Sequence, residues 1–523
     1  MRKLDWIAAH GGMALINTHP DYMSFSGSAA DSFEYPVRFY KEFLSYIRDN
    51  HAGSYWQALP REVAAHCSPL RRRTDERAED TLIPASREEY STSATDLDCH
   101  GRSENFPLAK VDLAESESSQ SAIEKRRRLR GKHAAVILFS YFPADPRPRR
   151  AAEALIAEGV TVDMICLQNE GVPSREVING VNVFRLPIKR CRGSKIKYVS
   201  QYSAFIIRAF WMLASRSFSR RYDFVHIHNM PDVLVFSALV PKVLGAKIIL
   251  DLHDPMPELM QTIFGMSESS FGVRFLKVLE KMSVGFADLV ITVNLACKRI
   301  YSARSCRPEK ITVVMNAPED TIFRLKPPSR DLVGGNGSAQ PFSLLYHGSL
   351  VPRNGLDLAV DALEIASHRI PNLQLRVCGE RNSYFEKVME SAHRRGLGAK
   401  VVYLGMKNRW EIVEAINCCD LGVVPNQRNT FTEINTPTRI FEYLSLGKPV
   451  IAPRTLGIED YFGNDDLIFF EAGDKQDLAR QIEFAYTNRE ELLRVVERGQ
   501  RVYLAHTWSQ QKSNFLESIG ELV

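Results

Sequence analysis

The stretch EINTPTRIFEYLSLGKPVIAP, residues 433–453, indicates the fold of this chain more clearly than any other. Asn435, Thr436 and Pro437 predict the start of a helix, since a Thr hydroxyl can cap free backbone amides and Pro fits the first helical turn. Gly447 is suited to end that helix, and the apolar residues after it predict a short buried strand. We therefore expect a loop, a helix and a strand in direct succession.

Two charged residues of this predicted helix are spaced to act together. Arg439 and Glu442 lie three positions apart, which places them on one face of a helix. Free amides at a helix N-terminus attract phosphate, and an inward carboxylate beside a cleft is well placed to hold a polyol. The pattern predicts a site for a ligand that carries both phosphate and hydroxyl groups.

The size and composition of the chain are those of a globular protein with several domains. At 523 residues it is too long for one typical domain, and 45% apolar with 25% charged residues is an ordinary globular composition. No run reaches the roughly 20 apolar residues that span a bilayer, and the N-terminus lacks the pattern of a secretory signal. The nine scattered cysteines suit a reducing compartment, and a net charge of +5 does not imply nucleic acid as a partner. We therefore expect a cytoplasmic protein.

Strands and helices are expected to alternate along most of the chain. From His133 onward a continuous apolar run, a loop, a helix and a second strand follow one another. The alternation runs to Asp254 and begins again at Phe342, after a segment rich in Gly, Pro and Ser, residues 326–341, that is expected to be a hinge. We predict an α/β fold with two Rossmann-like domains, residues 131–326 and 327–505, followed by a last helix, residues 506–523.

The first 130 residues differ from the rest. Residues 68–130 combine charged runs with few aromatic residues, so they are predicted to be a disordered linker. Residues 1–67 resemble the closing portion of a polysaccharide deacetylase domain, at His19-Pro20-Asp21-Tyr22 and at residues 56–64. The early Asp pair and the His-x-x-x-His with which that family binds metal do not precede His19, so this appendage is expected to be a remnant without a metal site. An unrelated helical appendage stays open as the alternative.

The stretch quoted first also carries a family resemblance. The pattern Pro-x-Lys/Arg-x-x-Glu-Tyr-Leu-x-x-Gly-Lys-Pro-Val, at residues 437–450, resembles the donor-binding helix of the retaining glycosyltransferases of the GT-B fold, family 4. The resemblance extends from about residue 131 to the end of the chain. It implies two Rossmann-like domains facing each other across a cleft, with the last helix crossing back to the first domain. It also implies a metal-independent hexosyl transfer from a UDP- or GDP-linked sugar without a further cofactor.

The resemblance also implies site residues at the strand ends and loops of both domains. Glu442 is expected to bond the ribose hydroxyls of the donor, and Arg353 with Arg439 its diphosphate, because planar guanidinium groups grip phosphate oxygens in pairs. The implied catalytic residues are His253, Arg353 and Glu442. The implied donor-binding residues are Gly348, Arg353, Gly379, Gly405, Glu433, Arg439 and Glu442, and those on the acceptor side are Asp145, Arg147, His228, Asp254 and Asn294.

One position departs from the family pattern. The family usually carries a first acidic residue eight positions before the ribose-binding Glu, where it touches the transferred sugar, and that position is Ile434 here. Either the loop is re-registered so that Glu433 serves, or the sugar contacts come from elsewhere.

A histidine pair in the first domain is a candidate for metal binding. His226 and His228 are two apart on a predicted strand and should point to the same face. No third ligand follows them at a convincing spacing, so no metal site is predicted.

A basic segment of the first domain leaves two interpretations open. Between Arg185 and Arg221 there are ten Lys or Arg residues and no Asp or Glu, and residues 202–215 are apolar around most of a helical circumference. This predicted helix is too short to span a bilayer. It either lies in the interface of an anionic membrane or is a core helix with a solvated basic flank.

These features predict a retaining glycosyltransferase that acts on a lipid-linked saccharide at the cytoplasmic membrane face, as in exopolysaccharide or O-antigen synthesis. Two alternatives stay open. A nucleotide-sugar epimerase shares the fold, although the sequence lacks the carboxylate-rich centre that its chemistry needs. A catalytically silent nucleotide-sugar-binding module is favoured by Ile434 in place of the first carboxylate.

Overall fold

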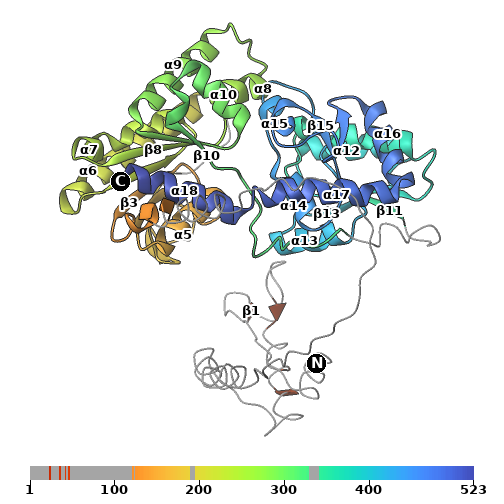
Figure 1. Ribbon diagram of the computed structural model, residues 1–523, viewed down its shortest axis with the longest axis horizontal. Coiled ribbons are helices and arrows are strands. Elements are labelled where there is room, and N and C mark those ends of the chain that lie inside the picture. Colours follow the sequence, from red (N-terminus) through yellow and green to blue (C-terminus); the bar gives the residue numbers. More distant parts are fainter. Residues whose placement is uncertain are drawn as a thin grey trace, which may run out of the picture. The chain divides into compact units, whose positions relative to one another are not determined.

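The computed structural model describes residues 23–24, 35–36, 42, 45–46, 121–122, 124–188, 195–328 and 341–523 (Figure 1). The chain divides into two compact units, residues 1–105 and 106–523. In the first unit, strands β1 (Met23–Ser24) and β2 (Tyr35–Pro36) pair in parallel. The deacetylase-like matches and most of the predicted hinge lie outside the described residues, so those predictions are untested.

The second unit begins its first domain with an eight-stranded sheet in the order β10-β9-β8-β7-β3-β4-β6-β5. All neighbouring strands pair in parallel except β5 and β6, which are antiparallel. The strands are β3 (His133–Leu138), β4 (Thr161–Leu167), β5 (Arg175–Ile178), β6 (Val181–Leu186), β7 (Phe224–His228), β8 (Lys247–Leu252), β9 (Leu289–Thr292) and β10 (Ile311–Val313).

Helices cover both faces of this sheet. Along β3, Ala135 and Ile137 enter one core while Val136 and Leu138 enter the other, because successive side chains of a strand point to opposite faces. The helical elements are α5 (Pro146–Ala157), α6 (Lys195–Ser219), η2 (Asp232–Ala238), α7 (Leu239–Val243), α8 (Met256–Phe264), α9 (Phe271–Phe286), α10 (Leu295–Arg304) and η3 (Pro308–Lys310).

The second domain is built on a six-stranded, fully parallel sheet in the order β13-β12-β11-β14-β15-β16. Its strands are β11 (Phe342–His347), β12 (Leu373–Cys378), β13 (Val401–Gly405), β14 (Leu421–Val423), β15 (Val450–Arg454) and β16 (Ile468–Glu471). Its helical elements are η5 (Pro352–Asn354), α11 (Leu356–Ala366), α12 (Ser383–Arg394), α13 (Arg409–Asn417), η6 (Thr432–Ile434), α14 (Thr438–Ser445), α15 (Leu456–Glu459), α16 (Lys475–Thr487) and α17 (Arg489–Leu504).

The stretch that indicated the fold forms the predicted loop, helix and strand, α14 and β15, with Gly447 at a φ of 71° after the helix. The predicted capping by Thr436 is wrong: its hydroxyl donates to the carbonyl of Gly457, and Pro437 stands at the N-cap of α14 without a side-chain cap. The first amides of α14 therefore have no capping side chain.

The last helix, α18 (Trp508–Leu522), follows α17 of the second domain and packs in the first. Phe515, Leu516 and Ile519 are buried in the core that also holds Val136 and Leu155 of α5. This connection joins the two domains at the end of the chain.

The prediction of a disordered linker up to residue 130 is wrong for residues 124–130. Residues 124–127 are helical, Lys125 Nζ lies 2.9 Å from Glu521 Oε2, and Arg126 Nη2 lies 3.6 Å from Glu517 Oε1 on α18. Leu129 is fully buried in the first domain. The basic run therefore packs against α18 through ion pairs, and Leu129 holds it to the core of the first domain.

Helix α6 combines features of both interpretations of the basic segment. Phe205, Ala209 and Leu213 are fully buried against the sheet, so one side of α6 is a core helix. Trp211 and Phe218 on its other side are exposed. In the described part of the chain, no helix is long and apolar enough to cross a membrane.

Candidate active site

The donor side of the candidate site is a pair of closely approaching strand ends in the second domain. Gly348 follows β11 with a φ of +123°, and Gly379 follows β12. A Cβ on Gly379 would lie 2.4 Å from the carbonyl oxygen of Gly348 and 2.8 Å from Leu350 Cγ. Only glycine fits at position 379, because a larger residue would collide with the main chain of Gly348. Gly405, also at a positive φ, ends the neighbouring strand β13.

Glu442 projects from α14 toward the end of β11. Its Oε2 lies 3.4 Å from His347 Nε2, and its side chain keeps 19% of its surface exposed. Burial raises the pKa of Glu442 to about 7, although Arg439, Arg150 and Arg409 act in the opposite direction. Burial lowers the pKa of His347 to about 3, so its imidazole is neutral and does not neutralise the carboxylate.

The two arginines assigned to the diphosphate differ in their surroundings. Arg439 donates from Nη1 to the His347 carbonyl and from Nη2 to Asn426 Oδ1, both at 2.9 Å, so its guanidinium also braces the turn before Gly348. Arg353 is half-buried with its guanidinium 5.8 Å from the centre of the Phe431 ring. No carboxylate of the described residues forms an ion pair with Arg353. Its charge is therefore the more available for a ligand phosphate.

On the acceptor side, a buried carboxylate that the sequence analysis did not single out organises the site. Asp251 of β8 binds Arg147 of α5 through both oxygens, with Nη2 at 2.7 Å from Oδ1 and Nε at 3.0 Å from Oδ2. His226 and His228 of β7 point to the same face, as predicted, with ring centroids 4.2 Å apart. His228 Nδ1 lies 3.3 Å from Asp251 Oδ2 and 2.9 Å from His253 Nε2.

The protonation states follow from burial and from Arg147. Burial favours the neutral carboxyl, but Arg147 and the surrounding imidazoles hold the pKa of Asp251 well below its usual range. Burial lowers the pKa of His253 to about 4 and that of His228 well below its usual value. Both imidazoles are neutral at pH 7, and His253, with 19% of its side chain exposed, is the member of the cluster that a ligand can reach.

The third potential metal ligand beside His226 and His228 does not come from their own strand, β7. It is Asp251 of the neighbouring strand, β8. Atoms of His226, His228 and Asp251 lie within 4.8 Å of one another, close enough to share a cation. Arg147 already binds both oxygens of Asp251, so a guanidinium provides the positive charge that a metal would bring. The geometry therefore gives no reason to assign a metal to this cluster.

The loop that carries His253 and Asp254 is held by Asn229, which the sequence analysis missed. Asn229 Oδ1 accepts from the His253 amide at 2.8 Å, and its Nδ2 donates to the Asp254 carbonyl at 3.1 Å. The His253 ring is oriented by His228, whose Nδ1 lies 2.9 Å from His253 Nε2. Burial raises the pKa of Asp254, and Arg353 of the second domain opposes this shift. Asp254 of the first domain and Arg353 of the second therefore lie near enough for their charges to interact.

Two residues expected on the acceptor side have structural bonds. Asn294 caps α10, and its Nδ2 donates to the carbonyl of Ile434 at 2.8 Å, which ties the two domains together. Asp145 caps α5 by accepting from the amide of Arg147 at 3.4 Å. Their positions at strand ends were read correctly, but their side chains hold the scaffold.

The structure also describes the position at which the first acidic residue is absent. Ile434 is buried and packs against the core of the first domain. Glu433 turns elsewhere: Oε2 lies 3.4 Å from Arg428 Nε, and Oε1 accepts from the amide of Leu456 at 3.3 Å. Ile434 is thus an interdomain contact, and Glu433 is half-buried in the loop before α14, the helix predicted to bind the donor.

The chain is similar to proteins of one enzyme class in both domains. The family model "Glycosyl transferase 4-like domain" matches residues 144–317, and "Glycosyl transferases group 1" matches residues 335–502. An uncharacterized glycosyltransferase of Bacillus subtilis, YqgM, is 24% identical over 305 residues, which are 58% of this chain and 78% of YqgM.

Solved structures share the fold. Sucrose-phosphate synthase from Thermosynechococcus elongatus superposes with a TM-score of 0.59 at 18% identity, over 75% of this chain and 98% of that one. The Anabaena protein HepE, in complex with UDP-glucose, gives a TM-score of 0.56 at 15% identity, over 74% of this chain and 99% of its own. The prediction of two Rossmann-like domains in the GT-B arrangement is confirmed.

Proposed function

The protein is a glycosyltransferase of the GT-B type, and we propose that it transfers a hexosyl group from a nucleotide sugar to a saccharide acceptor with retention of configuration, as family 4 enzymes do. The donor would be UDP- or GDP-linked. The reaction would need neither a metal nor a further cofactor.

The position of the Glu442 carboxylate at the end of β11 is the observation that carries this proposal. The partly exposed carboxylate lies 3.4 Å from Nε2 of His347, the last residue of β11, and Gly348 follows that residue with a positive φ. The uncapped N-terminus of α14 lies on the same helix as Glu442. A ribose diol and a diphosphate, joined as in a nucleotide sugar, match this combination of a carboxylate and free amides.

Catalysis would rest on stabilising the departing diphosphate. Arg353 has no ion-pair partner among the described residues, so its charge is free to offset the charge that accumulates on the leaving group. The acceptor hydroxyl would attack from the face that the diphosphate leaves, without a protein nucleophile. The neutral imidazole of His253 is suited to a hydrogen bond with the reacting sugar or the acceptor.

The acceptor that we propose is a lipid-linked saccharide at the cytoplasmic face of a membrane, in exopolysaccharide or O-antigen type synthesis. The basic and partly exposed helix α6 supports this choice, because a polyprenyl- or lipid-bound acceptor must be met at a bilayer surface. The enzyme would then be cytoplasmic and peripheral to the membrane.

A panel of UDP- and GDP-linked sugars, screened by thermal stabilisation, tests the donor site, since a bound ligand raises the melting temperature by mass action. NMR of the product of the stabilising donor gives the anomeric configuration. An inverted product would refute retention, and conversion of the donor without acceptor would favour the epimerase. Binding without turnover at saturating acceptor would favour the silent module, for which the buried Ile434 is the supporting observation.

A further inference from the structure

One face of the first domain is formed by helices whose inner sides share a core. Phe205 of α6, Leu234 of η2 and Val284 of α9 are fully buried in that core. In Figure 1 these helices lie on the opposite side of the sheet from α5 and α18. We call the outer sides of α6, α7, α8 and α9 the α6–α9 face.

The α6–α9 face is rich in large exposed apolar side chains. Of the 20 such side chains among the described residues, 12 lie on these four helices: Val199, Ile207, Trp211, Phe218, Leu239, Val243, Ile263, Phe264, Phe271, Phe275, Val278 and Met282. The four on α9 follow the spacing i, i+4, i+7, i+11, which places them on one side of the helix. Phe271 is 83% exposed and Trp211 67%. Such a concentration of apolar surface indicates a contact with another phase or molecule.

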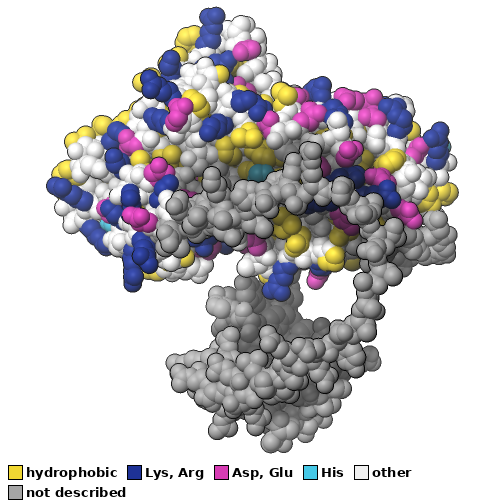
Figure 2. Space-filling view, in the orientation of Figure 1, with side chains coloured by type: hydrophobic (Ala, Val, Ile, Leu, Met, Phe, Trp, Pro, Cys, Tyr) yellow, Lys and Arg dark blue, Asp and Glu magenta, His cyan; other side chains and the backbone are white. Residues whose placement is uncertain are grey.

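Among the described residues of this face, the charge left without an ion-pair partner is positive. Glu268 and Asp288, which flank α9, are exposed, but they lie 2.8 Å from Lys277 Nζ and 2.9 Å from Lys242 Nζ. The carboxylates on the four helices are Glu258 and Glu280, and both are buried against Arg304, whose Nη1 and Nη2 lie 2.6 Å from them. The exposed charged residues on α6 and α9 include Arg208, Arg274 and Lys281. By contrast, Figure 2 shows Lys and Arg mixed with Asp and Glu over much of the surface that it presents.

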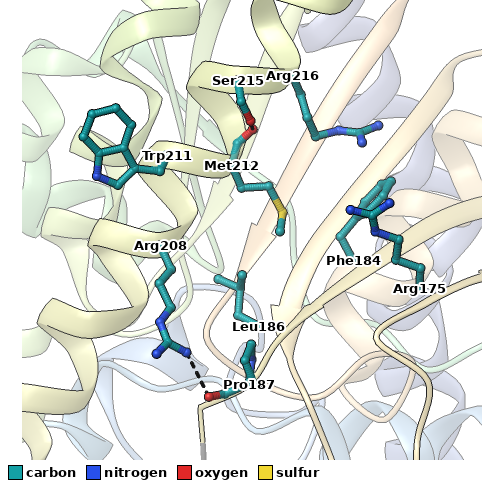
Figure 3. A pocket seen from close by; sticks show the side chains of 9 residues that line it. All are labelled: Arg175, Phe184, Leu186, Pro187, Arg208, Trp211, Met212, Ser215 and Arg216. Carbon is teal, nitrogen blue, oxygen red and sulfur yellow. Dashed lines mark hydrogen bonds between the residues drawn. The ribbon is translucent and has the colours of Figure 1, made fainter.

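A cavity of about 530 Å³ opens beside α6, against β5 and β6 (Figure 3). Its floor is apolar, with Phe184, Leu186 and Met212, and no Asp or Glu lines it. Arg208 donates to the Pro187 carbonyl at 3.0 Å, and Arg175 lies 5.8 Å from the centre of the Phe184 ring. Neither has a carboxylate partner in the described part of the chain, so an anionic group of an amphiphile would complement both.

We propose that the α6–α9 face docks on the surface of an anionic bilayer. The apolar side chains of α6 and α9 enter the interface, and Arg208, Arg274 and Lys281 lie at the level of the lipid phosphates. A protein partner would more commonly meet unpaired charge of both signs, whereas unpaired positive charge around an apolar stripe complements an anionic lipid surface. The inference deepens the proposed lipid-linked acceptor and rests on it for its purpose, but bilayer binding itself requires neither donor nor acceptor.

Co-sedimentation of the full chain with lipid vesicles tests the proposal. The protein should bind vesicles that contain about a third phosphatidylglycerol more tightly than pure phosphatidylcholine, and added salt should weaken the binding. Phe275→Ser should weaken it about tenfold or more, from the apolar burial that is lost. Leu504→Ser, of matched exposure (51% against 50%) but on α17, should not.

Charge reversal gives a second, independent measurement. Arg208→Glu changes the charge by two units, and at about fivefold per unit it should weaken anionic-vesicle binding about 30-fold. Arg394→Glu on the exposed surface of α12 is its control. All four variants should keep their activity on a soluble acceptor, which separates this proposal from the proposed function.

Three results would overturn docking on a bilayer. One is equal binding by Phe275→Ser and Leu504→Ser, and another is binding without dependence on the anionic lipid. The third is concentration-dependent self-association in analytical ultracentrifugation that Phe275→Ser abolishes, because the α6–α9 face would then contact a second copy of the chain.

Discussion

Replacing Glu442 by Gln should raise the stability of the free protein and lower its affinity for the donor, and both effects should depend on pH. Burial raises the pKa of Glu442 from 4.5 to about 7, so the folded protein binds more protons than the unfolded chain between those values. Stability contributed by the neutral carboxyl is present below pH 4.5 and is lost as the pH rises through 7. This upward shift of the pKa lowers the free energy of unfolding at pH 8 by up to about 3 kcal/mol, since one pKa unit is about 1.4 kcal/mol.

Gln resembles the protonated carboxyl and carries no charge to bury. The free Glu442→Gln protein should therefore unfold at a higher temperature than the wild type at pH 8, and the two should converge near pH 4. The donor should bind in the opposite order. A carboxylate that bonds ribose hydroxyls forms charge-assisted bonds of about 1.5 to 3 kcal/mol, so the variant should lose about tenfold to 100-fold in affinity at pH 8.

The pH dependence of donor affinity gives the sharper measurement. If the carboxylate is the binding form and its pKa is about 7, the ionised fraction rises from about a tenth at pH 6 to about nine tenths at pH 8. Wild-type affinity, measured by calorimetry, should therefore rise about tenfold over this range, and that of Glu442→Gln should stay nearly constant. Equal affinities for the two proteins at pH 8, or lower stability of the free variant there, would refute this reasoning.

Three further perturbations address other parts of the molecule. Arg353→Ala should lower turnover about 100-fold and donor affinity by less, because charge accumulates on the diphosphate as the sugar leaves; steady-state kinetics showing unchanged turnover would assign the residue to binding alone. Arg147→Ala should destabilise the fold by about 3 to 5 kcal/mol in urea unfolding, because Asp251 would stay buried without its guanidinium partner. Incubation of the wild type with a chelator should leave transfer intact, and a loss of transfer would reveal a metal. Deleting residues 1–105 should preserve transfer. Extending the deletion through residue 130 should lower the free energy of unfolding by about 2 to 5 kcal/mol, because it removes the buried Leu129. Equal stability of the two truncated proteins would show that the contacts of this segment with α18 and the first domain do not stabilise the fold.

Local pattern was sufficient for the elements of the fold. The continuous apolar run at His133 could only be a strand buried on both faces, and Gly447 with the run after it marked the end of α14 and the start of β15. Period, turn chemistry and strand alternation are properties of neighbouring residues, so they can be read along the chain. For the same reason the shared face of His226 and His228 was predictable.

The partners of these residues were decided by the tertiary structure. Arg147 and Asp251 are 104 positions apart, and only the tertiary fold brings the start of α5 to the end of β8. An arginine expected on the acceptor side thereby becomes the counter-ion of a buried carboxylate. Asn294 and Ile434 meet only because the two domains do. The α6–α9 face exists because four amphipathic helices share one layer, and each alone resembles an ordinary surface helix. Sequence determined which side chains stand at strand ends and helix faces, and the fold decided which of them remain open to a ligand, because contacts between distant residues leave no periodic signal in the chain.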